Sequence, residues 1–387
     1  MFQNIKKFNY KNFKHPFFLF RPKALEKSVK YFTQNFPGQI LYAVKTNPSR
    51  FIIECIYEKG IRSFDVASID EIKTVKSLFS DAKIFFMNPI KPRHSIREAY
   101  FNFGVKHFAI DHISELFKII EETSSASDLC LHLRLLVPNN FSKINLSEKF
   151  GINILDAPNL LKKIKKISFK TGISFHIGSQ CMHPNAFKIA IKMASDVLKI
   201  SKTEIDYFNV GGGFPSIYPG SKPFSLKKYF DEIQKEFKKL EFSSDVELLS
   251  EPGRALVSES MSLVVRVNLR KENNLFINDG VYGFLREAGL PGFVYPVKLF
   301  KKEKDDSELV PFSFYGPTCD SNDYMKGPFY LPDSVKEGDL IEIGQMGSYS
   351  ITMQTNFNGF YNQPEIFTID NEPILSMYSK YKKNKSC

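Results

Sequence analysis

Polar residues suited to covalent and acid–base chemistry follow several short apolar runs of this chain. They are Lys45, Asp65, Asn88, Arg134, His176, the run Gly211–Gly213 and Glu251. Singly, each has an ordinary interpretation, because a lysine at a strand end is most often a solvated surface charge. Random surface polarity would scatter such residues through strands and helices alike. Their repeated placement therefore predicts side chains that converge on one site.

Gly211, Gly212 and Gly213 directly follow the apolar run 207–210. Glycines at such a point let backbone N–H groups approach an anion, and phosphate is the usual occupant. A flexible turn is the alternative. The run fits neither the G-x-x-x-x-G-K-[ST] pattern of nucleoside triphosphate sites nor the G-x-G-x-x-G pattern of dinucleotide sites. We therefore expect the phosphate of another kind of ligand.

Glu251 and Arg254 belong to the sequence Glu-Pro-Gly-Arg, which puts a carboxylate and a guanidinium on one tight turn. Alone, the two residues could be a structural ion pair. Together with Lys45, His176 and the three glycines, they indicate pyridoxal 5′-phosphate. That cofactor needs a lysine amine for attachment, an acid facing its ring nitrogen and donors for its phosphate.

The elements that must position these residues are short β-rich runs alternating with amphipathic helical patterns. Strands are expected at 41–45, 62–66, 84–88, 106–110, 131–136, 173–177, 206–210 and 246–250. Helices are expected at 22–35, 49–59, 69–79, 112–122, 185–200 and 226–240. This α/β alternation matches a (β/α)8 TIM-like barrel, with a doubly wound open sheet as the alternative. Both architectures carry their chemistry at the carboxyl ends of the strands.

After about Arg254 the pattern changes to strands separated by turns, at 260–268, 275–278, 293–299, 313–315 and 340–343. This pattern predicts a mainly antiparallel β-domain. We therefore expect a cofactor-binding barrel at 22–255 and a β-domain made of 1–21 plus 256–387. The polar segment 138–149 is long for a barrel loop and could act as a lid. Residues 303–308 look like an exposed hairpin tip.

Composition narrows the class of protein. The 387 residues suffice for two domains, and 43% hydrophobic with 25% charged residues is the balance of a soluble globular protein. The net charge of +11 is spread thinly and its only dense run is 380–385, so neither nucleic acid nor a membrane is expected as a partner. The five scattered cysteines argue against a disulfide framework or a zinc site, and for a reducing compartment. With no evident signal peptide or transmembrane helix, we expect a cytoplasmic protein.

With these residues in view, the chain resembles the fold-type III pyridoxal-phosphate decarboxylases, and within them the bacterial branch of the ornithine decarboxylases. The matching stretches are in family order and span almost the whole chain. They are 42–47 (YAVKTN), 64–68 (FDVAS), 149–151 (KFG), 174–179 (SFHIGS), 209–215 (NVGGGFP), 250–254 (SEPGR), 278–283 (NDGVYG), 315–320 (YGPTCD), 346–349 (MGSY) and 356–360 (NFNGF).

The resemblance implies a role for each matching residue around the cofactor. Lys45 would carry the cofactor, Glu251 would pair with its ring nitrogen, and His176 would stack on the ring face. A polar cluster near the lysine would comprise Asp65, Glu71 and Arg134, and a carboxylate beside an arginine stays ionised. The phosphate would be held by Ser179, Gly211, Gly212, Gly213, Arg254 and Tyr349.

Cys319 and Asp320 carry the substrate side of the resemblance. The cysteine would return a proton to the α-carbon after decarboxylation, and the aspartate would bind the distal ammonium of a diamino acid. In the family this pair reaches the active site of the neighbouring subunit, so a homodimer with shared sites is implied. A buried small hydrophobe is the usual alternative for a lone cysteine. Further substrate contacts are expected from Tyr282, Glu287 and Phe357.

One segment departs from the family pattern. In the animal enzymes, a second acid after the stretch that matches 278–283 helps to bind the distal amine. Here that region is 284–293, and Glu287 is its nearest acid. This departure resembles the bacterial branch, some members of which accept both lysine and ornithine.

The leading hypothesis is decarboxylation of L-ornithine to putrescine in polyamine biosynthesis. Related diaminopimelate decarboxylases usually carry Cys-Glu and must accommodate a second carboxylate, so Cys319-Asp320 favours a plain cationic side chain. The runner-up is a dual or lysine-preferring enzyme that makes cadaverine, because one methylene is worth only ~1–3 kcal/mol in a pocket. The third hypothesis is a catalytically silent regulatory homologue. Such proteins typically lose the lysine or the cysteine, and both are present here.

Overall fold

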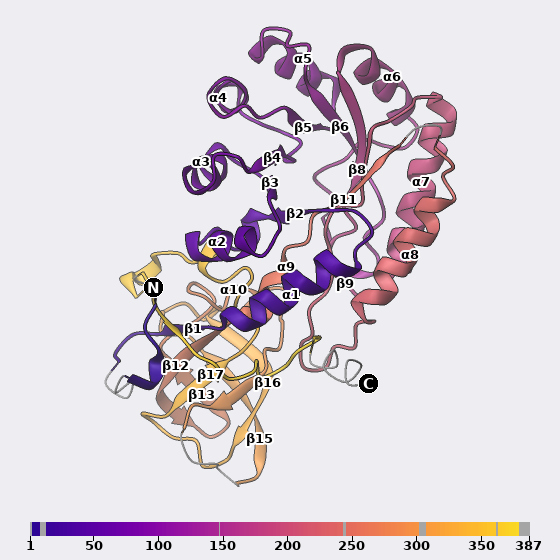
Figure 1. The fold of residues 1–387 in the computed structure, drawn as a ribbon. Helices are drawn as coiled ribbons and strands as arrows, with labels where there is room; N and C mark the ends of the chain where they lie inside the picture. The colour runs from indigo at the N-terminus through magenta and orange to yellow at the C-terminus, as the bar shows by residue number, and fades with distance from the viewer. Residues whose placement is uncertain are drawn as a thin grey trace, which may run out of the picture. The chain divides into compact units, whose positions relative to one another are not determined.

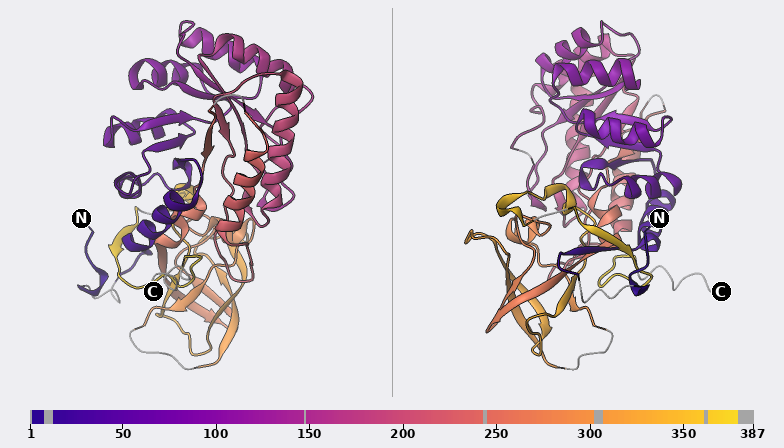
Figure 2. Two further views of the ribbon diagram at one scale, coloured as in Figure 1. Left: turned by 45° about the vertical axis from the view of Figure 1, so that its right-hand side comes forward. Right: turned by 90° about the vertical axis from the view of Figure 1, so that its left-hand side faces the viewer.

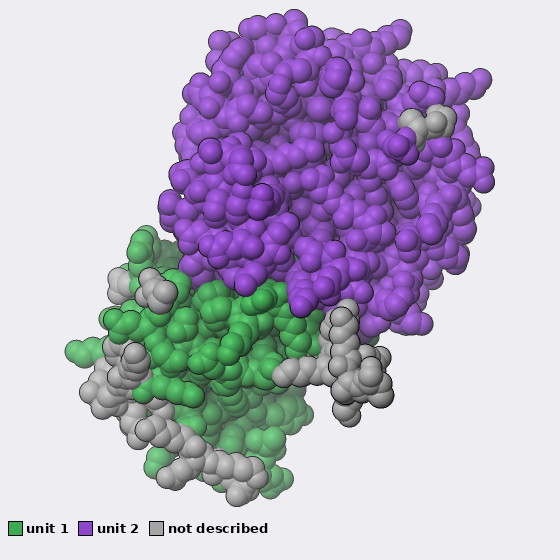
Figure 3. Space-filling view, viewed as in Figure 1, with its two compact units in different colours: residues 1–28, 216–222, 254–387 green, residues 29–215, 223–253 purple. Residues whose placement is uncertain are grey.

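The computed structural model describes residues 2–7, 13–146, 148–242, 245–301, 307–360 and 363–378 (Figures 1 and 2). The chain divides into two compact units, one of residues 1–28, 216–222 and 254–387, the other of residues 29–215 and 223–253 (Figure 3). The domain boundaries expected from the sequence stay a prediction. The basic run 380–385 and most of the expected hairpin tip at 303–308 lie outside the described residues.

The larger unit is built on a closed barrel of eight parallel strands, as the alternation of runs predicts. Around the barrel the strands follow the order β10, β11, β2, β3, β4, β5, β6, β8. Their bounds are β2 (Gln39–Ala43), β3 (Ser63–Val66), β4 (Lys83–Phe86), β5 (His107–Ile110), β6 (Cys130–Leu135), β8 (Lys170–Phe175), β10 (Tyr207–Asn209) and β11 (Glu247–Ser250). The doubly wound open sheet is therefore excluded, because the first and last strands pair: β11 lies beside β2.

Helices alternate with these strands along the chain (Figure 1). Their bounds are α1 (Pro22–Asn35), α2 (Arg50–Glu58), α3 (Ile69–Leu78), α4 (Arg93–Phe103), α5 (Ile113–Glu122), α6 (Ala157–Ile167), α7 (Asn185–Ser201) and α8 (Leu226–Lys238). Local caps set where they begin and end. At α3 the Ser68 hydroxyl accepts the Glu71 N–H, and α4 stops at Gly104, whose φ of 64° is left-handed.

The barrel interior is a packed core rather than a pore. Alternating strand residues supply buried side chains, among them Leu41, Phe85, Tyr207 and Leu249. A histidine pair also lies here: Nδ1 of His107 is 3.1 Å from Nε2 of His132, and both rings are buried. Strands that are buried on both faces have short, continuous apolar sequences. The positions of these strands could therefore be predicted from the sequence to within a few residues.

The smaller unit contains a mainly antiparallel sheet, as expected. Its order is β14, β17, β12, β13, β15, β16, and β1 pairs with β12 and β18. The bounds are β1 (Phe17–Phe20), β12 (Met261–Lys271), β13 (Asn274–Ile277), β14 (Val297–Leu299), β15 (Leu309–Tyr315), β16 (Tyr324–Pro332), β17 (Leu340–Ile343) and β18 (Glu365–Thr368). The sequence missed β16, which contains the strand-disfavouring pair Gly327-Pro328 and lies at the end of the strand order, where proline is tolerated.

One local expectation needs correction, and a second stays a prediction. Lys45 was expected to end its strand, but β2 ends at Ala43 and Lys45 lies in a 3-10 turn, η3 (Val44–Thr46). The chain bends because Pro48 has no N–H and forces Asn47 into extended backbone. Within 138–149, β7 (Ser142–Ile144) pairs with β9 (Ser179–Cys181) in a small sheet, and the lid role of this segment stays a prediction.

No helix among the described residues combines the length and apolarity needed to cross a lipid bilayer. The cytoplasmic location stays a prediction.

Candidate active site

Lys45 and Asp65 meet at the carboxyl end of the barrel strands. The register of β2 and β3 pairs Ala43 with Asp65, and the η3 turn then carries Lys45 over that carboxylate. Nζ of Lys45 lies 3.4 Å from Oδ2 of Asp65. The lysine side chain is 43% exposed whereas the aspartate is 4% exposed, so the amine is accessible while its partner is buried.

Glu71 completes an acidic environment for this lysine. Its Oε2 accepts the N–H of Ala67 at 2.7 Å, directly after β3. Burial, with a smaller contribution from the Asp65 charge, raises the pKa of Glu71 to about 7, and Lys45 opposes the rise. Lys45 therefore lies near two carboxyl groups. The pKa of Glu71 is near neutrality, and the carboxylate of Asp65 lies within ion-pair distance of Nζ.

Glu251 follows β11 and is held from the neighbouring strand. Nδ2 of Asn209, at the end of β10, donates to Oε1 of Glu251 at 2.7 Å. Burial and then Asp65 raise the pKa of Glu251 to about 7, while Lys45, Arg134 and the Asn209 hydrogen bond lower it. A buried carboxyl in this balance is suited to pair with a positive ring nitrogen.

Arg134 lies near the end of β6 and provides the positive counterpart. Burial lowers its pKa, and the charges of Glu251, Asp65 and Asp111 oppose that effect. Its guanidinium carbon lies 5.2 Å from the centroid of the Phe150 ring. Arg134 and Glu71 thus both interact electrostatically with Asp65, the ion-pair partner of Lys45, and the predicted cluster stays a prediction.

His176 follows β8 and is neutral. Its Nδ1 accepts the N–H of Gly178 at 3.1 Å, so the ring proton is assigned to Nε2. Burial is the largest cause that lowers its pKa well below the ordinary value, and the charges of Lys45 and Arg134 add to it. A neutral, fixed imidazole presents a flat face for stacking.

The three glycines lie where any side chain would clash with neighbouring backbone. Gly211 and Gly213 have φ values of 67° and 96°. A Cβ at Gly211 would lie 2.1 Å from the Phe175 carbonyl oxygen. At Gly212 it would lie 2.6 Å from the Glu251 carbonyl oxygen and 3.0 Å from Nε2 of His176. Ser179 begins β9, two residues before Cys181, whose N–H donates to the Gly213 carbonyl at 2.9 Å.

Arg254 and Tyr349 come together in the smaller unit. The Arg254 guanidinium carbon is 4.8 Å from the centroid of the Tyr349 ring. Nη1 and Nη2 of Arg254 donate to the two oxygens of Glu287 at 2.8 and 2.6 Å, and Nη1 also donates to the Tyr218 hydroxyl at 2.9 Å. Glu287 was expected to contact the substrate amine, but both its oxygens are engaged by Arg254. The sequence missed Tyr218 because nothing in its local pattern marks it.

The expected substrate residues form a second cluster in the smaller unit. The Tyr282 hydroxyl donates to Oδ2 of Asp320, and the ring centroids of Tyr282 and Phe357 are 4.6 Å apart. Oδ1 of Asp320 accepts the backbone N–H of Asn322 at 2.9 Å. Cys319 is exposed, with Sγ 3.4 Å from Oδ1 of Asn358. The Tyr282 hydrogen bond is the main cause that lowers the pKa of Asp320, which favours an anion ready for an ammonium group.

Asp323 holds that cluster together, and the sequence analysis missed it. Its buried carboxylate accepts the Val281 N–H at 2.8 Å and the Thr318 hydroxyl at 2.7 Å, so it joins the loop of Tyr282 to the loop of Cys319. A Cβ at Gly280 would lie 2.0 Å from Oδ1 of Asp323, and one at Gly316 would lie 2.2 Å from it. The available signal was the pair of turns Asn-Asp-Gly at 278–280 and Tyr-Gly-Pro at 315–317, since each needs its glycine for this approach.

Within the described ranges, no group of three or more His, Cys, Asp or Glu side chains is arranged to hold a metal ion. The polar residues of the larger unit instead offer one amine, buried carboxyls, a neutral imidazole and a glycine cradle.

Comparisons with known proteins found similar chains. A family model described as "Pyridoxal-dependent decarboxylase, pyridoxal binding domain" matches residues 23–258. The chain is 30% identical over 370 residues to the lysine/ornithine decarboxylase of Selenomonas ruminantium, covering 92% of this chain and 90% of that protein. It is 32% identical over 354 residues to antizyme inhibitor 2 of Xenopus laevis, covering 84% and 74%. The solved arginine decarboxylase of Paramecium bursaria Chlorella virus has a TM-score of 0.83 at 26% identity, covering 94% of this chain and 98% of that one.

Proposed function

This chain belongs to the pyridoxal-dependent decarboxylases, and from that premise we propose that it converts L-ornithine to putrescine by removing the α-carboxylate. The observation that carries the choice of a diamino acid is the Asp320 carboxylate. It is held by Tyr282 and Asn322 beside the exposed thiol of Cys319. An oriented carboxylate next to a proton-donating thiol suits a substrate with a distal ammonium.

The residues of the larger unit fit pyridoxal 5′-phosphate. The three glycines lie against neighbouring carbonyl oxygens, where a Cβ would clash. The Gly211 N–H donates to Oδ1 of Asn209 at 2.8 Å, so the backbone N–H groups of Gly212 and Gly213 are the ones that we propose for a phosphate. Glu251 offers a buried carboxyl for the ring nitrogen, and His176 offers a neutral ring for its face. Lys45 offers the accessible amine. The assignments of Ser179, Arg254 and Tyr349 to the phosphate stay predictions from the sequence.

When bound, the cofactor supplies an electron sink for the electrons left on the α-carbon as carbon dioxide departs. The role proposed for Glu251 is to keep the ring nitrogen positive, which requires that its own carboxyl stay anionic. Lys45, Arg134 and Asn209 all favour that anion against the effect of burial. Asn209 also fixes the carboxylate direction through its 2.7 Å hydrogen bond.

On the substrate side, Asp320 would bind the distal ammonium and Cys319 would give its thiol proton to the α-carbon. Phe357, 40% exposed beside Tyr282, would cover the methylene chain. Because both oxygens of Glu287 pair with Arg254, we now propose that Glu287 orients Arg254 rather than contacting the substrate.

The test is a panel of L-ornithine, L-lysine and L-arginine given to the purified protein with added cofactor, with kcat/KM as the measure of specificity. We expect carbon dioxide release with ornithine preferred. Lys45→Ala should abolish release, whereas Lys30→Ala, an exposed lysine of α1, should not. Release from none of the three substrates would overturn the proposal.

A dual or lysine-preferring enzyme is the second candidate, supported by the name of the Selenomonas ruminantium relative. The same panel decides between the two candidates. If kcat/KM is higher for lysine than for ornithine, lysine replaces ornithine as the proposed substrate. A silent regulatory homologue is the third candidate. A protein that acquires no visible absorbance from added cofactor, and releases no carbon dioxide, would favour it.

We also propose a homodimer in which Cys319 and Asp320 of one protomer serve the Lys45 site of the partner. The support is an exposed apolar stretch around the substrate cluster. Met353, Phe357 and Phe360 are 38%, 40% and 46% exposed. Large side chains grouped at such exposure are typical of an interaction surface.

A further inference from the structure

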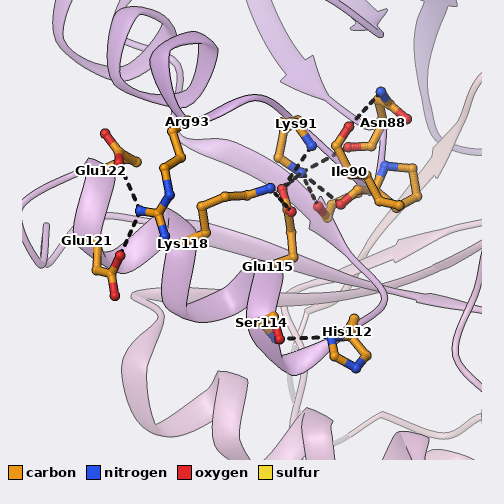
Figure 4. Close-up of polar contacts among 12 residues, drawn as sticks. Asn88, Ile90, Lys91, Arg93, His112, Ser114, Glu115, Lys118, Glu121 and Glu122 are labelled. Atoms are coloured by element: carbon orange, nitrogen blue, oxygen red, sulfur yellow. Dashed lines mark hydrogen bonds and ion pairs between the residues drawn. The ribbon is translucent and has the colours of Figure 1, made fainter.

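Lys91 is a fully buried lysine that the reaction described above does not use. It lies in the segment between β4 and α4, and its side chain has 0% exposure. Its ammonium donates to three backbone carbonyl oxygens, those of Asn88 at 2.9 Å, Pro89 at 3.2 Å and Ala109 at 2.6 Å (Figure 4). Lysine is rarely buried completely, so these contacts require a reason.

Glu115 of α5 balances the buried charge. Its Oε1 lies 3.0 Å from Nζ of Lys91 and also accepts the Lys91 backbone N–H at 3.1 Å. Its Oε2 pairs with Lys118 at 2.5 Å (Figure 4). Burial lowers the pKa of Lys91 to about 8, and the Glu115 charge and hydrogen bond oppose that effect. A charged ammonium surrounded by three carbonyls and a carboxylate acts as a structural cation.

This ammonium joins three separate pieces of the barrel. The carbonyls of Asn88 and Pro89 belong to the loop after β4, the Ala109 carbonyl belongs to β5, and Glu115 belongs to α5. Removing the ammonium would leave three carbonyls and one carboxylate without their buried partner, which is costly in a low-dielectric environment. The loop after β4 therefore depends on Lys91 for its position.

The same loop contacts the strand that carries Asp65. The Met87 N–H donates to the Val66 carbonyl at 3.1 Å, and Nδ2 of Asn88 is 3.4 Å from the Ala67 carbonyl oxygen. Ala67 makes a second hydrogen bond, in which its backbone N–H donates to Glu71 at 2.7 Å. Glu71 and Asp65 are two of the acids whose charges interact with Lys45.

We propose that Lys91 is a positioning residue for the Lys45 site. Its ammonium ties the loop after β4 to β5 and α5, and through Met87 and Asn88 that loop holds residues 65–71 in place beside Lys45. The inference rests on the proposed function of the Lys45 site. It differs from a general folding role because it predicts a local effect on one neighbouring segment.

The test compares Lys91→Met with Lys76→Met by hydrogen–deuterium exchange and mass spectrometry on the full-length protein with bound cofactor. Lys76, which is half-buried, is the control. Its ammonium also donates to two carbonyls, those of Ser80 and Ala82 at 2.8 Å each, but before β4 rather than after it. In Lys91→Met, amides in 64–72 and 85–92 should exchange about tenfold faster or more, while the α7 segment is unchanged. Lys76→Met should leave 64–72 at the wild-type rate.

Kinetics give the second measurement. Lys91→Met should lower kcat about tenfold to a hundredfold at saturating cofactor and substrate, because small displacements of supporting groups have effects of that size. KM for the amino acid should change less than about threefold, since Lys91 lies outside the proposed substrate contacts. If the wild type is inactive, the proposed function fails, while the exchange measurement still tests the positioning role.

If Lys91→Met does not fold, two further measurements still test the proposal. Lys91→Met/Glu115→Leu removes both charges, which is often tolerated where removal of one is not. It should fold and show the same faster exchange in 64–72. In the wild type, amides of 85–92 should exchange more slowly than those of the loop 138–141. Wild-type exchange at 64–72 in a folded Lys91 variant, or fast exchange of 85–92 in the wild type, would overturn the proposal.

Discussion

The side-chain amide of Asn209 donates a 2.7 Å hydrogen bond to the carboxylate of Glu251. Asn209 ends β10, and Glu251 directly follows β11, the strand that pairs with β10. Both residues are buried. The amide therefore restricts the carboxylate to one direction and favours its anionic form. Glu251 is the group proposed to hold the ring nitrogen of the cofactor, so this contact sets the electronics of the site.

We expect Glu251→Gln to keep the fold and to bind cofactor, because glutamine has the same shape and can still accept from Asn209. Its kcat should fall about a hundredfold or more, since the neutral amide cannot keep the ring nitrogen positive. Cofactor absorbance and kcat are the measurements. Glu247→Gln, an exposed position at the start of the same strand, is the control. Wild-type kcat in Glu251→Gln would remove Glu251 from the chemistry.

Gly212→Ala should weaken cofactor binding at least about tenfold and should also lower the thermal midpoint. The added Cβ would lie 2.6 Å from the Glu251 carbonyl oxygen and 3.0 Å from Nε2 of His176, so two proposed cofactor residues would have to shift. Titration of apoprotein with cofactor gives the affinity. Gly220→Ala is the comparison, because its φ of 74° strains the new residue but no atom lies within 4 Å of the Cβ. Equal cofactor affinities in the two variants would argue against the cradle.

Glu287→Ala should destabilise the folded protein by about 3–5 kcal/mol, because it leaves the buried guanidinium of Arg254 without its carboxylate. Urea denaturation measures the loss, and Glu337→Ala at an exposed position should have little effect. The ratio of kcat/KM for ornithine to that for lysine should stay near the wild-type ratio. A large change in that ratio with little loss of stability would restore Glu287 as a substrate contact.

Cys319→Ala should leave cofactor binding intact and impair correct product formation, because the thiol is proposed to protonate the α-carbon. Mixing this variant with Lys45→Ala tests whether the sites are shared. In a dimer with shared sites, mixed protomers contain one site with both residues, so activity should return to at most about half of the two-site value. A mixture that exchanges subunits and stays inactive would contradict the shared site.

The His107–His132 pair predicts acid sensitivity of the barrel. Burial is the main cause that lowers the pKa of His107 to about 2 and that of His132 to about 3. Below about pH 6.5 the unfolded chain binds protons at these residues and the folded barrel does not, so stability falls as pH falls, by up to about 1.4 kcal/mol per pH unit for each histidine. Above that pH their contribution is constant.

The measurement is the free energy of unfolding from pH 7.5 to pH 5. We expect the double variant His107→Gln/His132→Gln to show a shallower loss over this range than the wild type. His94→Gln, at an exposed position of α4, is expected to keep the wild-type slope. Parallel slopes in the wild type and the double variant would show that the pair does not remain neutral.

Local periodicity determined most of the fold. The runs expected for β3, β5, β8 and β11 overlap the observed strands, and the helical patterns at 22–35 and 69–79 agree with α1 and α3 to within a residue. Such patterns persist because a strand buried on both faces must be apolar throughout, and a helix must bury one stripe. The sequence also predicts a cofactor site from Lys45, His176, the three glycines and Glu251, and that assignment stays a prediction.

Only the tertiary structure decided which of these groups meet. Asn209 pairs with Glu251, and Arg254 pairs with Glu287. Asp323 joins two loops that no local sequence pattern connects. The sequence around Lys91 does not indicate that its ammonium contacts three carbonyl oxygens. Partners of this kind depend on how the barrel closes and how the turns of the β-sheet unit come together. Burial then decides which of the assembled charges and hydrogen bonds dominate, and local sequence patterns do not contain that information.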